Sequence, residues 1–205
     1  MKHFLIIGHK AVTSGDYSLN DMPGSAGRMD ILCRCVSSAF FLSHDLRRDV
    51  QVHLLLLGEP HPGRLVRFEG EYVRYLSPDE RSAGALIKKA LQKDISSFES
   101  RSTPGVNTRT ASLKELLDEF VEKGCELVYL REDGEDIRCT ADFAEDTVFI
   151  LGDHLGVTEE EEKLILDAGA RLLSIGPLSL HANHCITIIH DELDRRQGRR
   201  KNEYS

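Results

Sequence analysis

Short apolar runs separated by glycine-rich and polar segments make up the hydrophobic pattern of this chain. The runs at 3–8 and 50–58 are almost continuously apolar, which predicts strands that are buried on both faces. From Arg28 onward, apolar residues recur at spacings of three and four, which predicts an amphipathic helix. A strand, a helix and a second strand in this order are typical of an α/β fold.

The middle of the chain predicts a hairpin, a capped helix and a loop. Residues 64–76 alternate between apolar and polar side chains around Gly70, which is typical of two short antiparallel strands. Ser77, with Glu80 three residues later, forms a capping pattern, so a helix is expected to begin there. Residues 96–110 are mostly polar, which predicts an unusually long loop.

From residue 112 the pattern alternates regularly between helices and strands. Helices are predicted at 112–123, 158–169 and 180–195. Strands are predicted to end at Leu130, Gly152 and Gly176. The alternation predicts one α/β domain over residues 1–194, with a mostly parallel sheet flanked by helices, followed by a basic, mobile tail at 195–205. Ligands of such sheets bind beyond the carboxyl ends of the strands, so a pocket is expected where these strands end.

The net charge of −8 is unevenly distributed along the chain. Residues 1–110 carry +3, residues 111–194 carry −15 and residues 195–205 carry +4. The basic part permits binding to RNA, because a phosphate backbone responds to the local field within about 8–10 Å. A solvated acidic face with a basic tail explains the same distribution without RNA. The candidate RNA-binding residues are Lys10, Arg47, Arg48, Arg81, Arg101 and Arg109.

Nothing in the sequence indicates a membrane or an oxidising compartment. The apolar runs are shorter than the roughly 18–20 residues that span a bilayer, and the first residues predict a strand rather than a signal peptide. The five cysteines form no C-x-x-C pair, which fits a reducing compartment. We therefore expect a cytoplasmic protein. Cys33 and Cys35 are two apart on a predicted helix and are expected to pack in the core.

Three potential metal ligands lie close together near the end of the chain. His181, His184 and Cys185 would share one face of a helix. A zinc site requires three or four ligands, so His154 or His190 would have to complete this one. Apolar neighbours and the absence of an HExxH motif favour packing over metal binding, and no metal is expected. A metal-dependent hydrolase stays as an alternative.

Long segments of the chain resemble one known family, whereas the P-loop, GxGxxG and GxSxG motifs are absent. The segments "FLIIGHKAVTSGDYSLNDMPGSAGRMDILCRCVSSAFFLSH", "VRYLSPDERSAGALIKKAL" and "LSIGPLSLHANHCITIIHDELDRR" are similar to the archaeal TrmY family. These are tRNA (pseudouridine-54, N1) methyltransferases of the SPOUT class. The similarity covers nearly the whole chain in the same order, and only residues 131–145 match poorly.

The resemblance implies a cofactor, a partner and a set of binding residues. It implies S-adenosylmethionine bound in a C-terminal trefoil knot, a homodimer, and tRNA with a pseudouridine-containing T-arm as the substrate. Ribosomal-RNA pseudouridine N1-methyltransferases and a non-enzymatic RNA-binding dimer are the alternatives. The family's cofactor-binding positions correspond to Leu130, Gly152, Ile175, Gly176, Pro177, Leu178, Ser179, Leu180 and Cys185.

The expected chemistry suggests further roles. The sulfonium loses its positive charge during methyl transfer, so we expect a neutral pocket lined by backbone. Arg28 and Asp30, at the start of the first long helix, are the catalytic candidates. Arg28 is suited to hold a phosphate or a uracil carbonyl, and Asp30 to accept the N1 proton of pseudouridine. A surface salt bridge for Arg28 and a helix-dipole contact for Asp30 are the structural alternatives.

Overall fold

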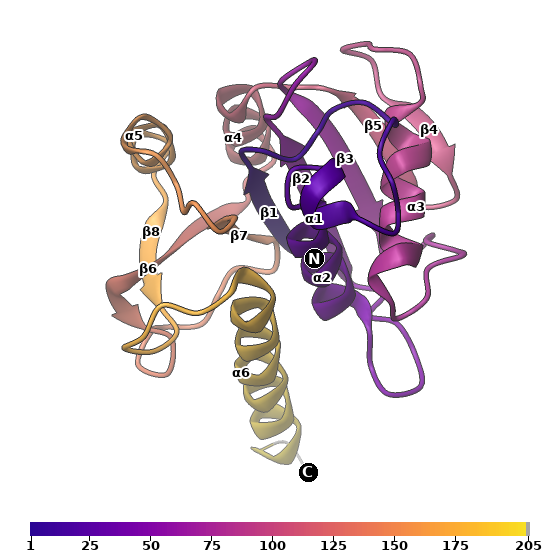
Figure 1. Cartoon of the computed structure of the whole chain (residues 1–205). Coiled ribbons are helices and arrows are strands. Elements are labelled where there is room, and N and C mark those ends of the chain that lie inside the picture. Colours follow the sequence, from indigo (N-terminus) through magenta and orange to yellow (C-terminus); the bar gives the residue numbers. More distant parts are fainter. Residues whose placement is uncertain (204–205) are drawn as a thin grey trace.

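One mixed β-sheet organises the chain. Residues 1–203, whose backbone the computed structural model describes, contain eight strands in the spatial order β4-β5-β3-β2-β1-β7-β6-β8 (Figure 1). Side chains are described for residues 1–198. The strands are β1 (Lys2–Gly8), β2 (Val50–Leu56), β3 (Arg64–Glu69), β4 (Ser100–Thr103), β5 (Val106–Thr110), β6 (Glu126–Asp136), β7 (Thr147–Gly152) and β8 (Arg171–Ser174). The helices are α1 (Met22–Ser25), α2 (Met29–Phe40), α3 (Glu80–Leu91), α4 (Leu113–Glu122), α5 (Glu159–Asp167) and α6 (Ala182–Glu203).

The larger part of the sheet is parallel. Strands β2, β1, β7, β6 and β8 run in one direction, and β3, β5 and β4 extend one edge with antiparallel pairs. This arrangement confirms the predicted fold class, a mostly parallel sheet flanked by helices. The register pairs Gly8 with Leu56 and Ile7 with Gly152. The carboxyl ends of the neighbouring strands β1, β2 and β7 therefore lie level with one another.

Helices cover both faces of the sheet, so β1 is apolar on both sides. Phe4 and Ile6 belong to a core that also contains residues of α2, α3 and α6, whereas Leu5 and Ile7 belong to a core with residues of α4 and α5. Successive residues of a strand point to opposite faces, which explains the continuous apolar run at 3–8. Cys33 and Cys35 are fully buried in the first core, as predicted.

The hairpin lies in a different part of the chain from the one predicted. β3 covers the first half of 64–76, but the backbone N–H of Val73 donates to the carbonyl of Glu69 at 2.8 Å and turns the chain out of the sheet. The hairpin is instead formed by β4 and β5 around Gly105, within the predicted loop at 96–110. Both edges of β3 are occupied, by β2 and by β5, which leaves no place for the predicted partner strand.

Two element boundaries also differ from the prediction. Asp79 caps α3 in place of Ser77, because its carboxylate accepts the backbone N–H of Ser82 at 2.8 Å. β6 continues past Leu130 to Asp136, because it pairs with β8 again after an irregularity in the register. The segment after Leu130 is therefore part of the sheet rather than a loop.

The basic tail is helical as far as the structure describes it. α6 continues to Glu203, whereas the predicted helix ends near Arg195. Arg195 pairs with Asp191, one turn earlier, at 2.7 Å, and such pairs stabilise a helix. The predicted mobility of 195–205 stays a prediction, and residues 204–205 lie outside the described part. Within that part, no helix has the length and apolar character required to cross a membrane.

Arg196 anchors the extended helix to the rest of the fold. Its guanidinium pairs with Glu192 at 2.9 Å and donates to the carbonyl of Ala141 at 3.1 Å. The guanidinium carbon lies 5.3 Å from the ring centroid of Phe143, and that of Arg171 lies 4.7 Å from the same ring. Both distances are typical of cation–π contacts. The poorly matching segment is thereby held against α6 and β8.

His190 links α6 to α2 and is poorly suited to carry a charge. Its Nε2 donates to the carbonyl of Ala39 at 3.0 Å, and its Nδ1 is buried without a partner among the described residues. The residue is 3% exposed, and burial lowers the pKa of His190 to about 4. Protonation would place a charge on a buried nitrogen that has no acceptor nearby.

The low pKa of His190 predicts a loss of stability in mild acid. The folded-state pKa lies below the unfolded value, so the unfolded chain binds the additional proton as the pH falls from about 6.5 toward 4. At pH 5 this residue is expected to cost about 2 kcal/mol of unfolding free energy relative to pH 7. Urea unfolding of the native protein and of His190→Gln at both pH values measures this cost. Equal pH dependence of the two proteins would contradict the assignment.

Candidate active site

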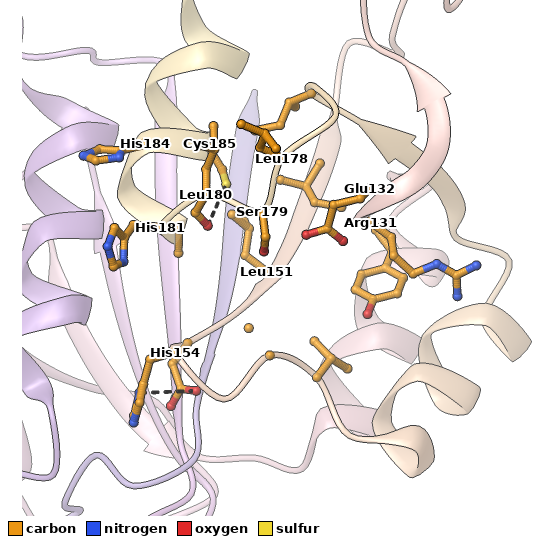
Figure 2. Close-up of a pocket in the computed structure, with 18 of the residues that line it drawn as sticks. Arg131, Glu132, Leu151, His154, Leu178, Ser179, Leu180, His181, His184 and Cys185 are labelled. Carbon is orange, nitrogen blue, oxygen red and sulfur yellow. Dashed lines mark hydrogen bonds and ion pairs between the residues drawn. The ribbon is translucent and has the colours of Figure 1, made fainter.

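A cavity of about 470 Å³ lies at the carboxyl ends of β7 and β8, beside the middle of β6 (Figure 2). Its position agrees with the pocket expected beyond the carboxyl ends of parallel strands. Pro177, which the resemblance also implied, is not among the described residues that line it. Eight of the nine predicted binding residues do line it, namely Leu130, Gly152, Ile175, Gly176, Leu178, Ser179, Leu180 and Cys185.

The irregular segment between β8 and α6 forms one wall of this cavity. Leu178 is 72% exposed and Leu180 is 40% exposed, which is unusual for leucine and leaves apolar surface for a ligand. Within the described residues, the backbone N–H groups of Leu178, Ser179 and Leu180 donate no hydrogen bond. Apolar side chains beside free backbone donors are suited to a flat, heteroatom-rich ring.

Cys185 closes this wall from the first turn of α6. Its thiol donates to the carbonyl of Leu180 at 3.7 Å, and burial raises the pKa of Cys185 to about 11. A thiol with that pKa is protonated at neutral pH, and a protonated thiol is a weak nucleophile. The geometry therefore indicates a packing contact for this residue.

The lining of the cavity includes one inward-pointing carboxylate, whereas the sequence predicted an uncharged lining. Glu132 points into the cavity near Ser179 (Figure 2), and a hydrogen bond from Ser179 lowers the pKa of Glu132. Arg131, the adjacent residue, pairs with Asp133 and Glu162. The side chain of Glu132 is therefore a carboxylate at neutral pH. Its role was missed because strand β6 was predicted to end at Leu130.

Gly152 allows the loop after β7 to fold closely against the strand end. A Cβ atom at this position would lie 2.1 Å from the carbonyl oxygen of Gly156 and 2.3 Å from its carbon. Both are backbone atoms, which cannot move away without displacing the loop. Asp153, His154, Gly156 and Val157 of this loop line the cavity, so its shape depends on glycine at position 152.

Arg28 and Asp30 lie beside the cavity and are bound to each other. The Arg28 guanidinium donates from Nε and Nη2 to the two oxygens of Asp30, both at 3.1 Å. Arg34 donates to the same carboxylate at 2.8 Å. The next residue, Ile31, lines the cavity. Burial raises the pKa of Asp30, but the hydrogen bonds and charges of both arginines outweigh burial and hold it below its ordinary value.

The two candidates differ in exposure and backbone conformation. The side chain of Arg28 is 41% exposed, and that of Asp30 only 4%. Arg28 has φ of +67°, a left-handed conformation that costs a non-glycine residue roughly 1–2 kcal/mol. The guanidinium of Arg28 is therefore partly open to solvent, whereas the carboxylate of Asp30 is buried between its two arginines.

The His/Cys cluster is not arranged as a metal site. The rings of His181 and His184 lie 5.7 Å apart in a T-shaped contact at the start of α6. In the described part of the chain, no group of three or more His, Cys, Asp or Glu side chains is placed to hold a metal ion. The metal-dependent hydrolase alternative therefore has no ligand set there.

Three of the six basic candidates are already engaged, and one of these, Arg48, donates to the carbonyl of Gly70 at 3.0 Å and lies 3.7 Å from Asp45 while 52% of its side chain stays exposed. Arg47 pairs with Asp194 at 2.5 Å, and Arg109 with Glu119 at 2.7 Å. The side chains of Arg47 and Arg109 are 14% and 17% exposed, so both serve the fold. The candidates that remain exposed are Lys10, Arg48, Arg81 and Arg101.

The match to a family model decides the identity of the site. A model described as "Putative SAM-dependent RNA methyltransferase" matches residues 1–198. The chain belongs to this family. Its cofactor class, S-adenosylmethionine (SAM), agrees with the one that the sequence resemblance implied.

Archaeal relatives of this methyltransferase align with nearly all of its chain. The tRNA (pseudouridine(54)-N(1))-methyltransferase of Methanosarcina mazei is 66% identical over 200 residues, which cover 98% of this chain and 94% of that one. The protein of the same name from Methanococcoides burtonii is 65% identical over 195 residues, with coverages of 95% and 96%. In Methanocaldococcus jannaschii the identity is 45% over 203 residues, with coverages of 96% and 98%. The resemblance to this family is thereby confirmed.

Solved structures of other methyltransferases share the fold. Archaeoglobus fulgidus Nep1, bound to S-adenosylhomocysteine (SAH), superposes with a TM-score of 0.63 at 14% identity and covers 96% of this chain and 99% of its own. The SpoU methyltransferase AviRb of Streptomyces viridochromogenes, in complex with SAM, gives 0.50 at 17% identity, with coverages of 95% and 57%. At these identities the similarity shows the fold, which is that of SPOUT-class enzymes.

The residues of the cavity fit the cofactor of the family. The volume of about 470 Å³ lies within the roughly 300–1,000 Å³ of typical small-molecule sites. Leu151, Leu178 and Leu180 offer apolar surface for a nucleoside. Glu132 supplies a negative charge, which suits a ligand with a sulfonium and an ammonium group.

Proposed function

We propose that this methyltransferase transfers a methyl group from SAM to N1 of pseudouridine 54 in tRNA. The observation that carries the proposal is the 66% identity, over 98% of this chain, to the tRNA (pseudouridine(54)-N(1))-methyltransferase of Methanosarcina mazei. The proposal is supported by a cavity of suitable volume at the strand ends, whose lining includes the carboxylate of Glu132.

The bound cofactor supplies an electrophilic methyl group, and this chain aligns and shields the reactants. The segment after β8 would hold the adenosine through backbone N–H groups and leucine side chains. The loop after β7 would close the opposite wall of the cavity. Alignment of the attacking nitrogen with the methyl group accounts for much of the rate enhancement in such a displacement.

Arg28 and Asp30 would act together on the RNA side. The guanidinium of Arg28 is exposed enough to bind a phosphate or a uracil carbonyl. Asp30 has a lowered pKa and both oxygens bound, so it is a weak proton acceptor. We therefore assign Asp30 the task of positioning Arg28, in place of the base role that the sequence suggested.

Glu132 is expected to favour SAM over SAH, because only SAM carries the sulfonium charge. In Glu132→Gln the affinity for SAM should fall about tenfold and that for SAH less, as calorimetry with both ligands can measure. Asp133→Asn is the control, since Asp133 pairs with Arg131. Unchanged affinities would contradict the assignment, and equal losses would place the carboxylate at the ammonium or ribose.

The proposal also covers the oligomeric state and the bound part of the tRNA, which the family resemblance implied, and the cellular location. We propose a homodimer that binds the T-arm with the target base splayed out of its stack, and a cytoplasmic location. The trefoil knot at the cofactor site also stays a prediction. Sedimentation of the protein alone and with an isolated T-arm hairpin tests the dimer and the minimal substrate.

The direct test of the reaction uses two matched RNAs. The protein is incubated with methyl-labelled SAM and a T-arm RNA that contains either pseudouridine or uridine at position 54. Label in the pseudouridine RNA alone is expected, because uridine presents carbon rather than an N1–H at that place. Equal label in both RNAs would point to a different acceptor and overturn the proposal.

A further inference from the structure

His9 bridges two carboxylates beside the cavity. It follows the last residue of β1, and its backbone N–H donates to Oδ2 of Asp153 at 2.8 Å. Its Nδ1 lies 3.2 Å from Oδ1 of Asp153, and its Nε2 lies 2.9 Å from Oε2 of Glu161. Carboxylates accept hydrogen bonds, so both ring nitrogens must carry protons. The His9 bridge, which comprises His9, Asp153 and Glu161, therefore contains an imidazolium.

The His9 bridge joins the two ends of the loop 153–158 that lines the cavity. Asp153 begins this loop directly after β7, and also accepts the backbone N–H of Leu155 at 2.8 Å. Glu161 lies in the first turn of α5, where it forms a capping box with Thr158. A link between the two carboxylates therefore fixes the end of β7 relative to the start of α5.

The surroundings keep His9 charged. The hydrogen bond to Asp153 is the largest effect on the pKa of His9 and raises it. Burial opposes this effect, the hydrogen bond to Glu161 adds to it, and the pKa rises to about 9. The other charged or titratable groups around the bridge are His154, 3.8 Å from Asp153, Arg28, whose charge is stabilised by Asp153, and the buried thiol of Cys35, whose pKa the charge of Asp153 helps to raise. Asp153 is 4% and Glu161 14% exposed, so the two carboxylates require this cation as a partner.

We propose that His9 is a positioning residue for the cofactor, which holds the loop 153–158 in its binding conformation. The inference rests on the proposed use of SAM. If His9 positions the loop, cofactor affinity should depend on the charge of His9. An ion pair that only stabilised the fold would not have this effect. No part of His9 itself lines the cavity, so the effect passes through Asp153 and the loop.

The first experiment measures SAH affinity by calorimetry between pH 6.5 and 10. The native protein is expected to lose affinity as the pH rises through about 9, because the bridge loses its charge there. In His9→Asn the affinity at pH 7 should be at least tenfold lower and should vary less with pH. The ammonium group of SAH titrates in every variant alike, so the difference between the proteins isolates His9.

His44→Asn is the matched control, since His44 is exposed on the loop between α2 and β2. It should bind SAH like the native protein at every pH. A folded His9→Asn variant with affinity within twofold of native would overturn the proposal. Failure of the native protein to bind SAH would instead contradict the proposed function.

A second variant keeps the proposal testable if His9→Asn does not fold. Glu161→Gln retains an oxygen for the capping box, since glutamine serves at that position. It removes one negative charge beside His9, so the loss of SAH affinity should move to a pH at least one unit lower. An unchanged midpoint would overturn the proposal.

Discussion

A Gly152→Ala variant is expected to bind SAH at least 100-fold more weakly than the native enzyme. The added methyl carbon would lie 2.1 Å from the carbonyl oxygen of Gly156, far inside van der Waals contact. The loop must move outward to relieve this clash, and loop residues that line the cavity move with it. The variant should still fold, because position 152 forms the last pair of β7 with β1.

Gly124→Ala provides the control for a general cost of replacing glycine. Gly124 has φ of +74°, and, its two chain neighbours aside, no atom of the described residues lies within 4 Å of the place that a Cβ would occupy there. Alanine at this position should lower the unfolding free energy by roughly 1–2 kcal/mol without changing SAH affinity. Calorimetry and thermal unfolding of both variants separate the two effects. SAH binding by Gly152→Ala within threefold of native would show that the loop tolerates the displacement.

Replacement of Arg28 by alanine is expected to lower kcat/KM for pseudouridine RNA about 100-fold, with SAH affinity preserved. A 100-fold decrease corresponds to roughly 2.7 kcal/mol of lost transition-state stabilisation. This is a reasonable cost for the loss of a charged hydrogen-bond donor to the RNA. Arg28 is not among the residues that line the cavity, so its loss should leave SAH affinity unchanged. Single-turnover methylation and SAH calorimetry on the same preparation measure both quantities.

Arg28→Gly separates the side chain from the backbone conformation. Glycine adopts φ of +67° without strain, so this variant should be about 1 kcal/mol more stable than Arg28→Ala. Both should lose the same activity if the guanidinium binds RNA. A rate within threefold of native in either variant would leave Arg28 as a structural partner of Asp30.

The parallel part of the fold was predictable because its signals are local. The apolar run at 3–8, the capping box at Thr158 and Glu161, and Gly152 at a strand end are each visible within a few residues of sequence. The position of the cavity followed from a general property of parallel sheets. Eight of its lining residues were named by the family resemblance, because spacing alone does not name a ligand.

The errors arose where distant segments compete for one partner. The alternation in 64–76 resembles a hairpin, but β3 pairs with β2 and with β5, about forty residues further on. Glu132 was missed because β6 extends along β8, a strand that begins at Arg171. No local pattern records either pairing. The prediction of an uncharged cavity followed from that second error.

The helix end at Arg195 was misplaced for a related reason. A run of like charges placed the predicted helix end near Arg195, but Arg195 and Arg196 pair with acidic residues one turn earlier and α6 continues. Arg196 also contacts Phe143, which is distant in sequence. The charge of a segment therefore predicts its structure poorly when its counter-charges belong to the preceding turn.

The central place of β1 constrains the order in which the protein is completed during synthesis. One edge of β1 is covered by β2 early, but the other waits for β7, almost one hundred residues later. A nascent chain that has emerged only as far as α4 therefore exposes an apolar strand edge, which is prone to pair with other chains. Premature termination before residue 147 should yield an aggregation-prone product, and the cofactor cavity cannot exist until translation is nearly complete.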